Sequence, residues 1–388
     1  MPGRRIGKGS MKRLRFGFLL IAAFLGACAT ASSAASQFRV PPRNSPKGLA
    51  RPIVIAESQP EEVVSKTATP FLPVEPTPTD PRPVQLTEGG CCSLPMWSRD
   101  SQWVLFLDKP GEFTPAGLYG VPVAGGSSTI VNDQVGVYSR SMTLVAYPLS
   151  GRVYVERWAD GTRWVIPSAG RIVQFSPSGR MVAWTVGSRS IRYPDVRQST
   201  IWVSDSDGNN AHEVITVNGG YLIGWEKGEQ GIYVTGRFGP SMPSGIWQID
   251  LETGAGRLVI ESERPRSALL SPDGSYIAFY VALSSDSEAN GMWIVPTDGT
   301  PAIKLGLFGA YRWRYDDVLV VIPMEMDAPG ISLWQVDASS GEAVQLTHPE
   351  LTSISIANND WQISPDGRQM VFLSAEDHNL RLLRIPNR

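Results

Sequence analysis

The sequence is poor in the residues on which metal and catalytic sites usually depend. Only three of its 388 residues are cysteine, only three are histidine, and charged residues make up 19% of the chain. The histidines, His212, His348 and His378, are not spaced as the ligands of a metal cage. The Gly-x-Ser-x-Gly motif of serine hydrolases does not occur either. We therefore expect no cofactor and no metal, and we name no catalytic residue.

Long hydrophobic runs are also absent. The most marked run, residues 16–24, follows a basic start and is too short to span a bilayer. It leads into the letters LGAC at 25–28, which resemble a bacterial lipobox. The resemblance implies that residues 1–27 are a lipoprotein signal peptide and that Cys28 carries a lipid. The exported protein would then be anchored to the cell envelope, facing the periplasm or the cell surface. Ordinary secretory cleavage just before Cys28 is the alternative.

The two other cysteines, Cys91 and Cys92, are adjacent. Neighbouring Cα atoms lie ~3.8 Å apart across a trans peptide, whereas disulfides usually join Cα atoms ~4.4–6.8 Å apart, so a bond between these two would be strained. A rigid vicinal disulfide and a pair of free thiols are therefore both open.

Positive charge is scarce outside the leader. Residues 1–27 hold six basic and no acidic residues, which leaves 29 of the 35 Lys and Arg against 37 Asp and Glu, a formal net charge of −8. An acidic surface repels phosphate backbones, and no basic stripe with interleaved aromatic residues is present. We expect no nucleic-acid partner, and we expect a monomer.

Residues 28–82 are rich in Ala, Ser, Thr and Pro. Such a composition favours the extended polyproline II conformation and cannot bury a core. We expect this segment to be a disordered tether between the lipid and a folded domain, residues 83–388.

One phrase recurs through that domain: an aromatic or aliphatic residue, a tight turn, and a strongly β-prone run. Four clear copies, spaced by 78, 95 and 93 residues, begin at positions 97, 175, 270 and 363. Weaker copies fill the gaps, at positions 138, 225 and 313. A third strand follows each opening, and the residues at the centres of these strands are Tyr119, Tyr154, Trp202, Trp247, Trp293, Trp334 and Leu383. Because one such unit cannot cover both its faces, the units stack around an axis. We predict an all-β fold, a seven-bladed β-propeller of four-stranded blades.

The letters VQLT occur twice, at 84–87 and at 344–347. The second copy is the expected outer strand of the sixth blade, and the seventh blade has no outer strand of its own after residues 380–385. We predict that residues 83–87 supply this strand from the N-terminal side, which closes the ring and removes an exposed edge.

The turn Ser-Pro-Asp-Gly followed by an aromatic-rich strand resembles the TolB-like propeller repeat. Ser271–Gly274 and Ser364–Gly367 match the turn fully, Ser176–Gly179 has Ser178 in place of Asp, and the first copy reads Ser98-Arg99-Asp100-Ser101. The resemblance implies an exported propeller of the kind that often serves as a docking platform. It departs from TolB in having seven blades instead of six and a tether instead of an N-terminal α/β domain, so TolB's own partners are not carried over.

Long polar loops between the second and third strands are expected on one face of the ring, where binding usually resides. The charges of these loops are segregated. The basic candidates, in the third and fourth blades, are Arg189, Arg192, Arg197 and Arg237. The acidic candidates, in the fifth to seventh blades, are Asp286, Glu288, Glu325, Asp327, Glu376 and Asp377, with His378 beside the last two. Solvated loop tips that bind nothing are the alternative.

Two hypotheses of function follow from this pattern. The first is a non-catalytic envelope lipoprotein, a scaffold or docking module whose loop face binds a protein, peptide or glycan. The alternative is a propeller-type lyase or hydrolase that acts on an extracytoplasmic polymer, with acidic residues and His378 at the channel mouth. Because no arranged nucleophile, base and acid can be named, we favour binding.

Overall fold

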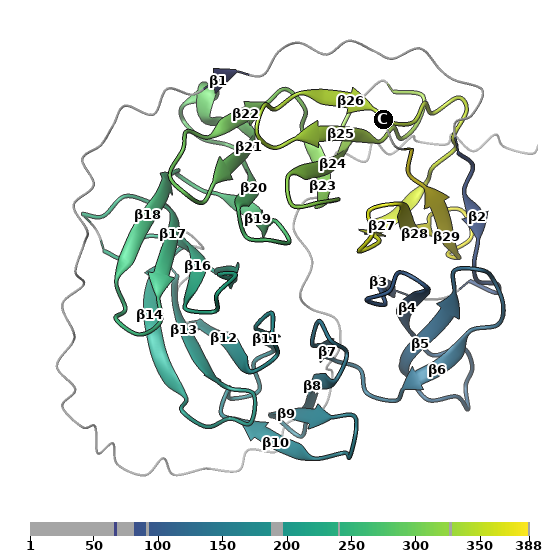
Figure 1. Ribbon diagram of the computed structural model, residues 1–388, viewed down its shortest axis with the longest axis horizontal. Helices are drawn as coiled ribbons and strands as arrows, with labels where there is room; N and C mark the ends of the chain where they lie inside the picture. Colours follow the sequence, from purple (N-terminus) through teal and green to yellow (C-terminus); the bar gives the residue numbers. More distant parts are fainter. Residues whose placement is uncertain are drawn as a thin grey trace, which may run out of the picture. The chain divides into compact units, whose positions relative to one another are not determined.

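Seven antiparallel sheets surround a central axis, which confirms the predicted seven-bladed, all-β propeller (Figure 1). The computed structural model describes residues 66–67, 81–90, 93–187, 197–239, 241–325 and 328–386. The blades follow one another in chain order around the axis.

Each blade has four strands, numbered here from the axis outward. The first strands are β3 (Ser93–Trp97), β7 (Val137–Tyr138), β11 (Val173–Phe175), β15 (Leu222–Trp225), β19 (Arg266–Leu270), β23 (Gly309–Trp313) and β27 (Ile356–Ile363). The second strands are β4 (Trp103–Asp108), β8 (Leu144–Leu149), β12 (Met181–Gly187), β16 (Gly231–Gly236), β20 (Tyr276–Val281), β24 (Val318–Pro323) and β28 (Gln369–Ser374). The third strands are β5 (Gly117–Pro122), β9 (Arg152–Arg157), β13 (Gln198–Asp205), β17 (Gly245–Asp250), β21 (Gly291–Pro296), β25 (Trp334–Asp337) and β29 (Leu380–Arg384). The outer strands are β6 (Thr129–Asn132), β10 (Arg163–Ile166), β14 (His212–Asn218), β18 (Gly256–Glu261), β22 (Ile303–Leu305), β26 (Ala343–Gln345) and β2 (Val84–Gln85).

The turn between first and second strands explains the glycine that ends the Ser-Pro-Asp-Gly phrase. Gly179, Gly274 and Gly367 occupy this position with φ of 76°, 82° and 70°, in the left-handed region that glycine enters without steric cost. In the fifth blade, Ser271 Oγ donates to Asp273 Oδ1 over 2.8 Å, a local bond that holds the turn closed. The repeat therefore encodes the hairpin through its own side chains.

The core lies between blades because the second and third strands are covered on both faces. All six residues of β16 are buried. Between the first and seventh blades, Val104 and Phe106 pack in one cluster with Val371 and Leu373. Of the predicted third-strand centres, the buried ones are Tyr119, Trp247, Trp334 and Leu383, and the half-buried ones are Tyr154, Trp202 and Trp293. Each blade is thus stabilised mainly by its neighbours.

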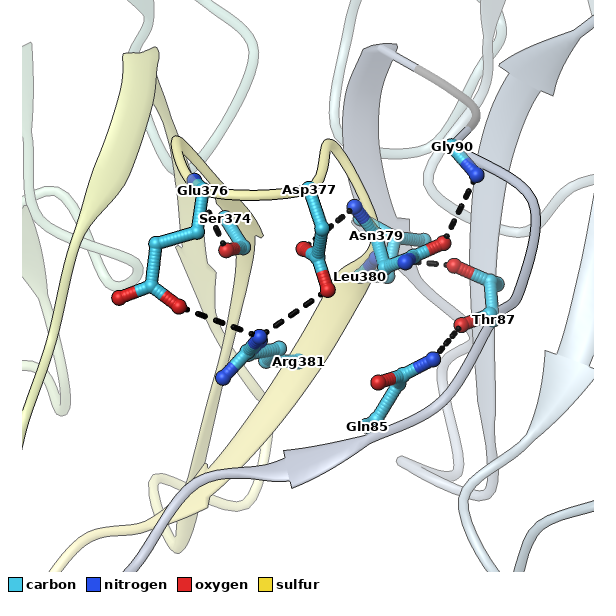
Figure 2. Close-up of polar contacts among 9 residues, drawn as sticks. All are labelled: Gln85, Thr87, Gly90, Ser374, Glu376, Asp377, Asn379, Leu380 and Arg381. Carbon is cyan, nitrogen blue, oxygen red and sulfur yellow. Dashed lines mark hydrogen bonds and ion pairs between the residues drawn. The ribbon is translucent and has the colours of Figure 1, made fainter.

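Residues 83–87 close the ring, as predicted. β2 runs antiparallel to β29, and the two ends of the colour scale meet there in Figure 1. Leu86 N donates to Leu380 O over 2.8 Å. In return, Leu380 N donates to Thr87 Oγ1 over 2.9 Å, and Gln85 Nε2 donates to Thr87 O over 2.8 Å (Figure 2). The N-terminal end of the propeller is therefore an integral strand of its last blade.

The second VQLT copy makes the same set of bonds in the sixth blade. Leu346 N donates to Leu333 O over 2.7 Å, and Leu333 N donates to Thr347 Oγ1 over 3.0 Å. Gln345 Nε2 donates to Thr347 O over 3.0 Å. The two copies share their letters because each caps the start of a third strand in the same way.

Two short elements add to the four-stranded pattern. β1 (Lys66–Thr67) falls within the predicted tether and pairs in parallel with β22, and a 3₁₀ turn, η2 (Ser287–Ala289), lies between β20 and β21. The remainder of 1–80 is outside the described residues. In the part of the chain that the structure describes, no helix has the length and apolar character needed to cross a membrane.

Candidate functional site

Strand direction gives the ring two different faces. Because successive strands are antiparallel, the first-to-second and third-to-fourth turns share one face, which we call the turn face. The second-to-third loops share the opposite face with the connections between successive blades, and we call it the loop face. The charged residues that were predicted as a binding surface and that the structure describes belong to the loop face.

A pocket of about 430 Å³ lies on the loop face around the fourth blade. Arg237, one of the predicted basic residues, lines it together with Arg264, from the connection between the fourth and fifth blades, and Arg266, the first residue of β19. Glu263 is the acidic residue of the lining, and its Oε2 accepts a hydrogen bond from Ser284 Oγ over 3.0 Å. Three guanidinium groups against one carboxylate favour an anionic ligand.

Backbone contacts fix the walls of this pocket. Asn218 and Arg237 form an isolated β-bridge, in which Arg237 N donates to Asn218 O over 3.1 Å and Asn218 N donates to Arg237 O over 2.8 Å. Gly220 lets the preceding connection approach β16 closely, since a Cβ atom there would lie 1.8 Å from the carbonyl oxygen of Thr235. The pocket is therefore built on the rigid ends of strands.

Tyr221 and Arg197 lie at the edge of the same region. The Tyr221 hydroxyl accepts a hydrogen bond from Ala268 N over 2.9 Å, and burial raises the pKa of Tyr221 to about 12, so the phenol stays neutral. Arg197 is exposed, and its carbonyl oxygen accepts from the N–H of Gly219, a lining residue, over 2.9 Å. The structure thus brings Arg197 and Arg237 to one side of the loop face.

Two acidic candidates of the fifth blade form contacts within their own blade. Asp286 Oδ1 accepts from Glu288 N over 2.9 Å and caps η2. Glu288 Oε2 lies 3.8 Å from Lys304 Nζ, and its side chain is almost fully exposed. Asp286 therefore shapes its own loop, while Glu288 is available to solvent.

The acidic candidates of the seventh blade point back to the ring closure (Figure 2). Glu376 and Asp377 form ion pairs with Arg381 of β29, at 3.4 Å and 3.0 Å. Hydrogen bonds from Asn379 lower the pKa of Asp377. The same Asn379 accepts from Gly90 N through its Oδ1 over 3.1 Å, which ties this loop to the closing segment. His378 is exposed, with a left-handed φ of 55°.

The structure describes only one of the remaining predicted residues. Glu325 is exposed at the end of β24. The residues that lie outside the described ranges are Cys28, Cys91, Cys92, Arg189, Arg192 and Asp327. Of the predicted loop-face charges, the structure thus describes two of the four basic residues and five of the six acidic ones.

A second, larger hollow of about 820 Å³ opens at the axis on the turn face. Its walls come from the first-to-second turns and strand ends of six blades, among them Trp97, Arg99, Tyr138, Arg140 and Trp313. A neighbouring hollow of about 390 Å³ shares Tyr138 and Arg140 and adds the fourth blade through Trp225 and Lys227. Together the two hollows touch all seven blades, which places them on the axis.

These features do not follow from the sequence pattern of the repeat. Arg264 lies in a blade-to-blade connection and Arg266 begins β19, whereas the predicted surface comprises second-to-third loops alone, although all these segments meet at the loop face. The concentration of charged residues in ERPR, at 263–266, was the feature of the sequence that could have indicated a binding site here. For the turn face, the sequence predicts only minimal hairpins. Within the described ranges, no group of three or more His, Cys, Asp or Glu is placed to hold a metal ion.

Comparison with known proteins supports the fold. No protein-family profile matches the sequence, and no curated protein matches it. Among solved structures, an oligogalacturonate lyase in complex with manganese is similar with a TM-score of 0.55 and 13% identity, over 77% of this chain and 91% of that one. An acylaminoacyl peptidase of Pyrococcus horikoshii is similar with a TM-score of 0.53 and 14% identity, over 76% of this chain and 52% of that one. TolB from Acinetobacter baumannii has a TM-score of 0.39 and 13% identity, over 77% of this chain and 64% of that one. At such identities the likeness shows a propeller fold alone.

Proposed function

We propose that the chain is a non-catalytic, lipid-anchored protein of the bacterial cell envelope whose loop face binds a protein, peptide or glycan partner. The observation that carries this proposal is the loop-face pocket, where Arg237, Arg264 and Arg266 gather around one hollow. Guanidinium groups bind carboxylates and phosphates through paired, charge-assisted hydrogen bonds. The partner therefore presents an anionic group to this pocket.

The alternative, a lyase or hydrolase, receives less support. It depends on acidic residues and His378 at the channel mouth, yet Glu376 and Asp377 are paired with Arg381 beside the ring closure. Both carboxylates are therefore already engaged by a guanidinium of their own blade. Binding requires no further groups than those that the pocket supplies.

Charge reversal in the pocket tests the binding proposal. We expect the double variant Arg237→Glu/Arg266→Glu, made in the full-length, detergent-solubilised protein, to lose at least about tenfold in capture of its envelope partner, because two attractive charges become repulsive. Cross-linking followed by mass spectrometry measures the loss. Arg152→Glu is the matched control, since Arg152 is an exposed arginine of the loop face on the second blade. Equal capture by the wild type and the double variant would exclude the pocket as the binding site.

Lipid anchoring is tested independently at Cys28. We expect Cys28→Ser to release the protein from the membrane fraction, because stable anchoring of an exported domain here depends on the acylated thiol. Cell fractionation with immunoblotting gives the result, and Cys91→Ser serves as the control that should stay with the membranes. Retention of the Cys28→Ser variant in the membrane fraction would show that the lipobox interpretation is wrong.

A further inference from the structure

The second position of the first-to-second turn marks a ring around the axis on the turn face. From the first blade to the seventh, this position is occupied by Arg99, Arg140, Pro177, Lys227, Pro272, Tyr315 and Pro365. All of these except Tyr315 line the axial hollow or its neighbour. Proline is the residue that suits this turn position, because its fixed φ prepares the turn. Three blades have a cationic residue at this position instead of proline.

These three cations form no close ion pair within the described residues, although, against the effect of burial, hydrogen bonds and the charge of Lys227 lower the pKa of Asp273. Asp273, the acidic residue of the lining, already accepts from Ser271 Oγ over 2.8 Å and from Ser275 N over 3.0 Å. A basic rim on a chain that is otherwise acidic attracts anions to the axis.

The walls of the axial hollow combine aromatic and other apolar residues with serines and Arg314, whose side chains are hydrogen-bonded within the protein. Trp97 Nε1 donates to Gln362 O over 3.3 Å, and Trp313 Nε1 donates to Leu269 O over 3.0 Å. The Tyr138 hydroxyl donates to the carbonyl oxygen of Gln134, so its polar atom is also used. Trp97 and Tyr138, which are half-buried, and to a smaller extent the buried Trp313 therefore offer a ligand apolar surface and no free donors.

We propose that this axial hollow is a second binding site, for a peptide segment of a partner protein that combines acidic and apolar side chains. Carboxylates of the peptide pair with Arg99, Arg140 and Lys227 at the rim, and its apolar side chains enter between Trp97, Tyr138 and Trp313. A sugar acid would satisfy the rim but would bury its hydroxyl groups against walls that offer them few partners, at a cost in free energy. The observations thus favour a peptide over a glycan.

Isothermal titration calorimetry of the full-length protein in detergent tests the site with a synthetic peptide, Glu-Phe-Glu-Pro repeated twice. We expect saturable binding that weakens at high salt, because the rim contacts are exposed charge pairs. A Lys-Phe-Lys-Pro peptide and an oligoglutamate of equal length should each bind at least about tenfold more weakly. The triple variant Arg99→Glu/Arg140→Glu/Lys227→Glu should lose at least about tenfold in affinity for the first peptide.

The loop-face double variant Arg237→Glu/Arg266→Glu separates this site from the proposed function, since it should bind the peptide as the wild type does. The single variant Arg140→Ala should show a smaller, graded loss at an unchanged thermal unfolding midpoint, which guards against misfolding of the triple variant. Three results would each overturn the proposal: no saturable binding, undiminished binding by the triple variant, or equal competition by a uronic-acid oligosaccharide.

Discussion

Replacing Leu86 with aspartate is expected to lower the free energy of unfolding by about 3–5 kcal/mol, because it places a charge in the apolar layer that closes the ring. Leu86 is 8% exposed and packs in one cluster with Val104 and Phe106 of the first blade and Leu382 of the seventh. Its backbone N–H donates the hydrogen bond that joins the closing segment, residues 83–87, to Leu380 O. A carboxylate at this place finds no cation within the cluster, so the closing strand detaches to hydrate it.

The same chain offers two controls for this change. Val84→Asp alters the same strand at a side chain that is 61% exposed, and it should change stability by no more than about 0.5 kcal/mol. Leu346→Asp alters the twin position in the sixth blade, where the side chain is fully buried. Both Leu variants should lower the midpoint of urea unfolding followed by tryptophan fluorescence. Leu86→Asp alone should also associate at high concentration, because release of β2 exposes the edge of β29. A wild-type midpoint for Leu86→Asp would mean that the seam, where residues 83–87 pair with β29, contributes nothing to stability.

The architecture was predictable from sequence because its determinants are local. Turn residues recur at fixed offsets, the runs between them alternate as strands do, and each unit must bury its faces on copies of itself. The seam was predictable for the same reason, since Gln85 and Thr87 repeat the bonds of Gln345 and Thr347. The two segments share a sequence because they make the same hydrogen bonds.

The candidate sites were less predictable because they depend on which segments meet in space. Arg266 and Arg237 are neighbours only through the packing of β16 against its connections. The carboxylates of Glu376 and Asp377 carried the right charge for a binding face, but Arg381 lies within their reach on β29. Charge composition indicates where a surface is polar, and only the fold decides which charges are already paired.

Glu229 replaces the glycine of the repeat in the fourth blade. After the ring closure, substitution of this residue has the largest expected effect on the free energy of unfolding. Glu229 stands at the glycine position of the fourth blade's turn, with a left-handed φ of 59°. A non-glycine residue in this conformation costs about 1 kcal/mol. Its side chain, 6% exposed, reaches the third blade, where its carboxylate accepts from the backbone N–H of Ser178 and from Ser178 Oγ at 2.7 Å. Ser101 plays the same part at the seam, where its Oγ accepts from Asp366 N over 3.2 Å. We infer that Glu229 and Ser101 each clip their blade to the preceding one through a side chain at this turn position.

The clip makes stability depend on pH. Burial raises the pKa of Glu229, but the hydrogen bonds from the amide and hydroxyl of Ser178 outweigh it and hold the pKa below the ordinary value of 4.5. A carboxyl with a lowered pKa in the folded state stabilises the fold fully above its unfolded pKa. This contribution is then lost as the pH falls below 4.5 and through the folded value.

We expect Glu229→Ala to lower the free energy of unfolding by about 2 kcal/mol at neutral pH, because Ser178 loses a charged acceptor while the backbone strain remains. Glu229→Gly should lose less, since glycine removes the strain together with the clip. The stability difference between wild type and Glu229→Gln should shrink as the pH falls below 4.5, as urea titrations across that range would show. A Glu229→Gly variant at least as stable as the wild type, or a Gln difference that does not change with pH, would show that this carboxylate does not hold the blades together.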